Sequence, residues 1–109
     1  MSEKELQEKA FYDVHPATDV EDAENGAVVT IEIPGVGAEG VELNVQSRIL
    51  ELSATGTLKR GGFPVRYRRS FELSDAVDTE HITAKTRDGV LTLFLPKAET
   101  ARVRRISVE

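Results

Sequence analysis

Alternating apolar and polar positions divide much of the chain into short β-strands. Residues 27–33 read Ala-Val-Val-Thr-Ile-Glu-Ile and residues 41–47 read Val-Glu-Leu-Asn-Val-Gln-Ser, a period of two that is typical of strands with one buried face. Residues 49–54 repeat the pattern, and residues 65–73 form a longer, charged strand. Residues 18–21 predict a short edge strand. We therefore expect every second side chain of these segments to face a common core.

The most informative stretch is residues 82–97. An Asp-Gly pair at positions 88–89 separates two β-prone runs, and this pair favours a two-residue hairpin turn because Gly, and Asp better than most residues, tolerates positive φ. Residues 90–95 are apolar except for Thr92, which predicts a strand inside a sheet or sandwich rather than at a half-exposed edge. Pro96 ends this strand because it has no backbone N–H to donate.

These segments together predict the fold class. About seven short strands, no interior helix and frequent turns indicate an all-β, antiparallel, immunoglobulin-like β-sandwich. The 109 residues are enough for one such domain. We assign residues 16–97 to the sandwich, residues 1–15 to an N-terminal arm that is helical or disordered, and residues 98–109 to a C-terminal extension. The glycine-containing segments 34–40 and 56–62 are expected to be connections.

Composition narrows the functional classes. The net charge of −5 argues against nucleic acid and anionic membranes as partners, and the absence of cysteine excludes disulfides and thiolate metal sites. No apolar run is long enough to span a bilayer, and the N-terminus lacks the apolar core of a signal peptide, so we expect a cytoplasmic protein. His15 and His81 have no plausible ligand set, and we expect neither a metal nor a cofactor.

Catalytic candidates are weak. Ser74, Asp75 and His81 supply the residue types of a catalytic triad, but no nucleophile-elbow pattern surrounds the serine. The loop at residues 34–40 lacks the spacing of a phosphate-binding loop, and a strand rather than a helix is predicted after it. We therefore predict that the protein is not an enzyme.

A family signature overlaps the hairpin. The pattern Ala84-x-x-x-Asp88-Gly89-Val90-Leu91-x-Leu93-x-Leu95-Pro96-Lys97 resembles the signature of the small heat shock proteins, the α-crystallin family. Residues 28–35 are similar to the family's segment that ends in Pro-Gly, and residues 67–78 to its Arg-rich strand and following loop. The resemblance implies that residues 16–97 are an α-crystallin domain.

The resemblance also implies an assembly motif. Ile106-Ser107-Val108 is similar to the I-x-I/V anchor, which in the family inserts two apolar side chains into a groove of a neighbouring subunit. Side chains at i and i+2 of an extended segment point the same way, which suits adjacent pockets at a sheet edge. An ordinary ragged terminus is the alternative. The receiving groove, by the same resemblance, is lined by Leu43, Val45, Ile82 and Ala84.

A dimer interface is implied at the Arg-rich strand. Tyr67 and Arg69 fall where the resemblance implies dimer contacts, with Arg69 paired to carboxylates across a two-fold axis. We prefer this interpretation to a nucleic-acid strip, because Arg68 and Arg69 point to opposite faces of a strand. The connection at residues 57–64 is short for the exchanged strand of bacterial and plant members, and the N-terminal arm is short. A dimer or small homo-oligomer is expected.

The predicted function follows from this resemblance. We expect an ATP-independent holdase chaperone that binds unfolding client proteins through exposed apolar surface. Its partners would be these clients and itself, with a second small heat shock protein as a further candidate. The alternative is a non-catalytic adaptor or co-chaperone module that binds one specific folded partner. Protection of unrelated proteins distinguishes the two.

Overall fold

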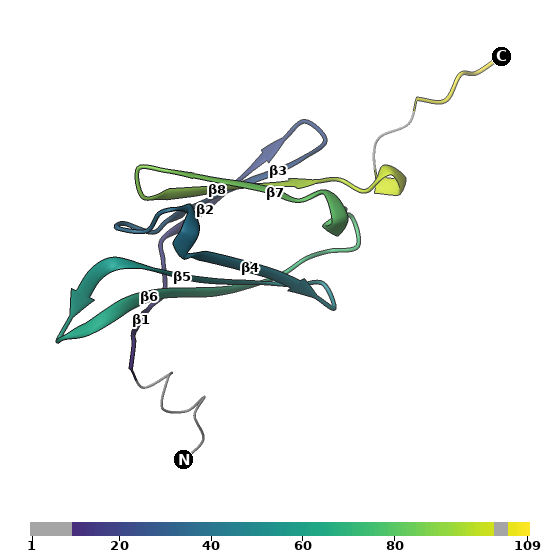
Figure 1. Cartoon of the computed structure of the whole chain (residues 1–109). Coiled ribbons are helices and arrows are strands. Elements are labelled where there is room, and N and C mark those ends of the chain that lie inside the picture. Colours follow the sequence, from purple (N-terminus) through teal and green to yellow (C-terminus); the bar gives the residue numbers. More distant parts are fainter. Residues whose placement is uncertain (1–9, 102–104) are drawn as a thin grey trace.

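The chain folds into two four-stranded sheets that pack face to face (Figure 1). The computed structural model describes residues 10–101 and 105–109. The strands are β1 (Tyr12–Val14), β2 (Thr18–Ala23), β3 (Gly26–Glu32), β4 (Val41–Gln46), β5 (Ile49–Arg60), β6 (Phe63–Glu72), β7 (Thr83–Arg87) and β8 (Val90–Pro96). Single 3-10 turns are η1 (Ala38–Gly40), η2 (Thr79–His81) and η3 (Glu99–Ala101). The prediction of an all-β sandwich is confirmed.

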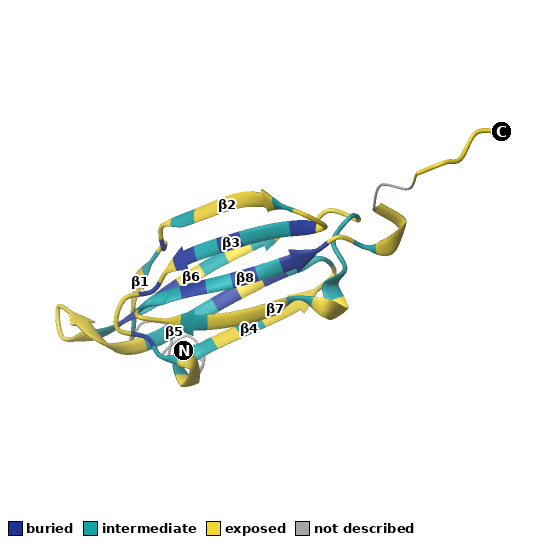
Figure 2. Cartoon of the chain, turned by 90° about the horizontal axis from the view of Figure 1, so that it is seen from above, coloured by how far each residue is buried: buried dark blue, intermediate teal, exposed yellow. Residues whose placement is uncertain are grey.

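Strand order determines which parts of the sandwich are edges. One sheet has the order β1-β6-β5-β4 and the other β2-β3-β8-β7. Every pair is antiparallel except β1 with β6, which is parallel. Residues 15–17 join β1 to β2, so these two edge strands share one side of the sandwich. Strands β4 and β7 are the edges of the opposite side, as the view from above shows (Figure 2).

The core lies between the sheets and is almost entirely aliphatic. Its buried members are Val29, Ile31, Ile33, Val36, Leu50, Leu52, Ala54, Val65, Tyr67, Leu73, Leu91, Leu93 and Leu95. The alternation of strands β3, β5 and β8 supplies most of them, as the sequence predicted. Each buried Val, Leu or Ile side chain stabilises the fold by roughly 1.5–3 kcal/mol relative to exposure. Strand β8 lies between β3 and β7, so it is an inner strand of its sheet, as its apolar sequence predicted.

Two tight turns contain residues with positive φ, and residue type marks only the first of them. Asp88 and Gly89 have φ of 52° and 77° and close the β7–β8 hairpin, as predicted. Ser47 and Arg48 have φ of 50° and 61° at the β4–β5 turn. A left-handed Arg is unusual because its Cβ crowds the backbone, and no glycine or asparagine marks this turn in the sequence.

Two parts of the prediction differ from the structure. Strand β5 runs through the expected connection to Arg60, and only Gly61 and Gly62 form the turn to β6. The β5–β6 pairing shifts register between Thr55 and Lys59, and a Cβ on Gly56 would clash with the Gly35 carbonyl oxygen, so the glycine permits a close approach rather than a loop. The second difference is strand β1, which lies within the predicted arm. The helix-or-disorder prediction for residues 1–9 lies outside the described residues.

Candidate assembly and client-binding edge

Strand β4 presents apolar side chains at the edge of its sheet. Leu43 and Val45 pair with Leu52 and Leu50 of β5, so they face the interior beside two buried leucines. Leu43 packs partly against the core, whereas Val45 is 38% exposed. The difference from β5 is one of position, because β4 has a neighbouring strand on one side only.

Strand β7 presents the second half of the same side. Ala84 pairs with the buried Leu93 and therefore faces inward, yet it is exposed. Ile82, which precedes β7, packs partly against the core. The structure thus brings Leu43, Val45, Ile82 and Ala84 to one side of the sandwich, which we call the β4/β7 edge. All four were predicted from the sequence to line a groove, and that role stays a prediction.

One polar atom is buried at the β4/β7 edge without a partner. Thr86 pairs with Leu91 in β8, so its side chain lies on the inward face of β7. Among the described residues its Oγ1 is buried and makes no hydrogen bond. A buried hydroxyl without a partner lowers stability, because the group loses its hydration and gains nothing in return. This residue was not among the predicted site residues.

The predicted anchor residues are exposed. Ile106 is 83% and Val108 91% exposed, and residues 105–109 form neither helix nor strand. Two large aliphatic side chains in water, at i and i+2, are free to bind a partner. The structure of the single chain does not bring them to the β4/β7 edge, so the anchor role stays a prediction.

Tyr67 and Arg69 lie inside the sandwich rather than on an outer face. Tyr67 is 7% exposed, and its hydroxyl donates to the Pro34 carbonyl at 3.1 Å. Arg69 Nη1 donates to the Pro16 carbonyl at 3.2 Å, and the guanidinium lies 5.2 Å from the centroid of the Phe71 ring. Within the described chain, Arg69 Nε is buried and makes no hydrogen bond. Their contact with a second chain stays a prediction.

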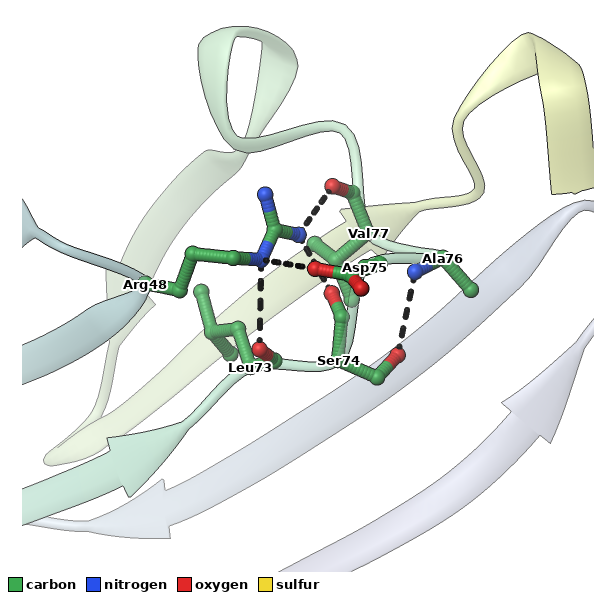
Figure 3. Close-up of polar contacts among 6 residues, drawn as sticks. All are labelled: Arg48, Leu73, Ser74, Asp75, Ala76 and Val77. Atoms are coloured by element: carbon green, nitrogen blue, oxygen red, sulfur yellow. Dashed lines mark hydrogen bonds and ion pairs between the residues drawn. The ribbon is translucent and has the colours of Figure 1, made fainter.

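Arg48 has a structural role, beyond its place in a tight turn, that the sequence did not predict. Its Nε donates to the Leu73 carbonyl at 3.3 Å, and its Nη2 donates to the carbonyls of Ser74 and Val77, the latter at 2.7 Å (Figure 3). Asp75 lies 3.6 Å from the same Nε. The arginine therefore fixes the segment that carries the chain from β6 towards β7. No local pattern signals this role, because the contacts join residues more than 20 positions apart.

A charged contact joins β1 to β6 on the β1/β2 side of the sandwich. Asp13 of β1 accepts hydrogen bonds from Arg66 of β6 at 2.7 and 3.1 Å, and Arg68 Nη1 lies 3.9 Å away. The hydrogen bond from Arg66 lowers the pKa of Asp13, and the charges of Arg66 and Arg68 act in the same direction. The Phe11 ring lies 4.4 Å from the Arg66 guanidinium. These contacts hold β1 on β6.

The residues of the hypothetical triad do not assemble. His81 Nδ1 lies 2.7 Å from Asp78 Oδ2, Asp75 pairs with Arg48, and Ser74 Oγ accepts from the Ala76 N–H. Within residues 10–101 and 105–109, no three His, Asp or Glu side chains gather as a metal site. No helix in this part of the chain is long and apolar enough to cross a membrane.

Comparison with known proteins adds evidence independent of this geometry. The model of the Hsp20/alpha crystallin family matches residues 19–109. The chain is 34% identical over 91 residues to an 18 kDa heat shock protein of Streptomyces albus G, covering 74% of this chain and 64% of that protein. It is 29% identical over 103 residues to small heat shock protein C4 of Rickettsia felis, covering 85% of this chain and 63% of that protein.

Solved structures agree with this match. A small heat-shock protein from Xylella fastidiosa superposes with a TM-score of 0.69 and 26% identity, over 88% of this chain and 97% of that one. Heat shock protein 16.0 from Schizosaccharomyces pombe also gives a TM-score of 0.69, with 25% identity over 89% of this chain and 77% of that one. This chain spans less than two thirds of the length of both curated relatives above.

Proposed function

The chain belongs to the Hsp20/alpha crystallin family of non-enzymatic chaperones, and from this premise we propose that it is an ATP-independent holdase. The observation that carries the proposal is the β4/β7 edge. At this edge, side chains on the inward faces of β4 and β7 are only partly covered. Val45, for example, is 38% exposed. Apolar segments of unfolding proteins would bind at this edge instead of to one another, which suppresses their aggregation.

The anchor residues would regulate access to this edge. Ile106 and Val108 have the spacing that suits an extended segment added beside a sheet edge, and both are exposed. A tail from a second copy would cover the β4/β7 edge, and its dissociation on warming would uncover it. Self-assembly and client binding would then compete for one apolar surface. Such a chaperone would act in the cytoplasm, without a cofactor, nucleic acid or membrane.

Arg69 supports a second contact between copies. Its guanidinium has one buried N–H group that no described residue accepts, and buried donors are normally paired. A carboxylate from a second chain would satisfy it with a strong, charge-assisted hydrogen bond. Tyr67 supports this interface less directly, because its hydroxyl already donates to Pro34. We propose a dimer or small homo-oligomer built from these contacts, with a second small heat shock protein as a further partner.

The first test is light scattering of two unrelated heat-labile proteins, warmed with and without this chain in the absence of ATP. We expect the chain to suppress the scattering of both at near-stoichiometric ratios. Protection of neither would contradict the holdase proposal. It would favour the alternative, an adaptor that binds one folded partner.

The anchor is tested separately by the double substitution Ile106→Ala and Val108→Ala. We expect smaller particles by light scattering or sedimentation, because the tail loses the side chains that would bind the edge. Val20→Ala is a matched control, since Val20 is also exposed, at 59%, but lies on the other side of the sandwich. Unchanged particle mass for the double variant would contradict the anchor role and leave the holdase test unaffected.

A further inference from the structure

The outer face of the β2-β3-β8-β7 sheet carries opposite charges on its two sides. Cross-strand register places Asp19, Thr30, Thr92 and Lys85 in one row across the four strands. The neighbours of Thr30 and Thr92 along their strands are buried, so this row points away from the core. The acid lies on edge strand β2, the base on edge strand β7, and two hydroxyls lie between them.

The two adjacent rows each add one charge, but not in the same row. Glu21 on β2 lies in the row of Val28, Phe94 and Thr83, whereas Arg87 on β7 lies in the row of Val90 and Glu32. Shallow hollows lie at both sides. The acidic one is lined by Asp19, Thr30 and Glu32, among others, and the basic one by Lys85, Arg87 and Thr92, among others.

Three of these four charged side chains on β2 and β7 have no partner in the described part of the chain. Asp19, Glu21 and Lys85 make no hydrogen bond or ion pair with any described residue. Arg87 pairs with the adjacent Asp88 at 3.5 Å, but both side chains are almost fully exposed. Strand spacing separates the acidic from the basic side by about 14 Å, which is too far for a direct pair. The charges of the row are therefore available to a partner.

The middle of the face is partly apolar. Val28, Val90 and Phe94 point outward between the two charged sides and are partly buried. The Phe94 ring lies against Gly26, where an added Cβ would come within 2.7 Å of it. Figure 2 shows this sheet from above, with exposed residues along β2 and β7 and less exposed ones on β3 and β8.

The outer face of the other sheet is different. Arg66 and Arg68 already face Asp13 within the chain. Its other outward positions on β4 and β5 include Glu42, Asn44, Glu51 and Ser53, so no apolar strip runs along these strands. Of the two outer faces of the described sandwich, the β2-β3-β8-β7 face alone combines an apolar middle with separated charges of opposite sign.

We propose that this outer face binds the same face of a second copy around a two-fold axis parallel to the strands. Such an axis places the β2 side of one copy over the β7 side of the other. Asp19 then lies over Lys85 of its partner, Thr30 over Thr92, and each contact occurs twice. Asp19 and Lys85 therefore bring opposite charges together at two symmetric points, and in the next row Val28 lies over Phe94 of the partner. This contact needs neither the C-terminal tail nor client binding.

The contact is weak and sensitive to salt. Four strands at their usual spacing, each five to seven residues long, give a face of roughly 300–400 Å² per copy, about half of what a stable interface of standard size buries. Surface charge pairs are screened by salt. The face would therefore add to assembly through the tail and, alone, would give a monomer–dimer equilibrium that dissociates at high salt.

The test uses the whole 109-residue chain carrying Ile106→Ala and Val108→Ala together with Arg69→Gln, so that neither the tail nor the proposed Arg69 contact contributes to assembly. We expect sedimentation equilibrium at low salt to show a monomer–dimer equilibrium. Asp19→Lys or Lys85→Glu should each raise its dissociation constant about tenfold, because each places like charges opposite one another at two symmetric points. The combined charge swap in one chain should restore the dimer. Mixing the two single variants should restore it as well.

Glu51→Lys is the matched control, because Glu51 is exposed on the outer face of the other sheet. It should leave the equilibrium unchanged, and circular dichroism should report the same fold for all variants. A chain that stays monomeric at low salt overturns the proposal. So does a charge swap that fails to restore the dimer. The charges would then serve only to keep two edge strands from aggregating. Altered client protection without altered mass would also overturn it, in favour of a client-binding face.

Discussion

On the β1/β2 side of the sandwich, the chain crosses between the sheets through residues 15–17, and Arg69 binds the carbonyl of Pro16 inside that crossing. On the β4/β7 side, Leu43, Val45, Ile82 and Ala84 reach the surface with partial cover. Both sides contain one buried polar atom without a partner in the described chain, Arg69 Nε on the first and Thr86 Oγ1 on the second.

The difference separates stability from binding. On the β1/β2 side, charged and hydrogen-bonded contacts hold β1 in place, while Tyr12 and Val20 stay exposed. Apolar side chains on the β4/β7 side contribute less to folding than they would if covered, because stabilisation scales with the apolar area removed from water. The apolar surface of these side chains that stays exposed is available to bind a tail or a client. Four substitutions test this division, in order of decreasing expected effect on the free energy of unfolding.

Arg48→Ala should have the largest effect. Arg48 lies where β4 ends and fixes the segment that leads to β7, so its loss should free one end of the β4/β7 side. Hydrogen bonds from a charged group to carbonyls are strong, and we expect a loss of about 2 kcal/mol, discounted for partial exposure. Urea unfolding measures it. Arg87→Ala is the control, because Arg87 pairs only weakly with Asp88, and a similar loss for both would contradict a special role for Arg48.

Thr86→Val should stabilise the protein. Valine has nearly the shape of threonine but no hydroxyl, so the buried, unpaired Oγ1 disappears without leaving a cavity. We expect a gain of about 1 kcal/mol in urea unfolding. Thr83→Val on the outward face of β7 should change little, since Thr83 is exposed. A loss of stability at position 86 would mean that its hydroxyl has a partner in solution.

Asp13→Asn should cost about 0.5 kcal/mol at neutral pH, since exposed ion pairs contribute little. The folded pKa of Asp13 is lowered, so its contribution is present above the ordinary pKa of an aspartate and is lost as pH falls through the lowered value. Unfolding curves of the two proteins should therefore converge in acid and at high salt. Asp22→Asn, at an exposed position of β2, is the control. If the stability difference between Asp13→Asn and the unchanged protein grew in acid, the lowered pKa of Asp13 would not be the cause of its contribution.

Val45→Ser should have the smallest effect on folding, within about 0.5 kcal/mol, because Val45 is already 38% exposed. Its effect on client protection should be larger, measured as the ratio of chaperone to client that halves light scattering. Val20→Ser on the other side of the sandwich should change neither quantity. If Val45→Ser destabilised the fold but left client protection unchanged, Val45 would serve stability rather than binding, which would contradict the division between the two sides.

Local pattern determined much of this protein. Alternation identified the inward residues of β3, β4 and β5, and the Asp-Gly pair at 88–89 specified the β7–β8 hairpin, because both depend on near neighbours in the chain. The signature at residues 84–97 led to the family. These features follow from steric preference and a period of two, which a sequence carries directly.

Strand order was decided by the tertiary structure. Leu43 and Leu52 lie in the same kind of alternating pattern, yet Leu52 is buried and Leu43 is partly open, because β5 has neighbours on both sides and β4 on one. Arg48, Asp13 and Thr86 gain their roles from residues far away in the chain or on another strand. Alternation fixes which face of a strand is apolar, whereas the packing of the two sheets decides whether that face is covered.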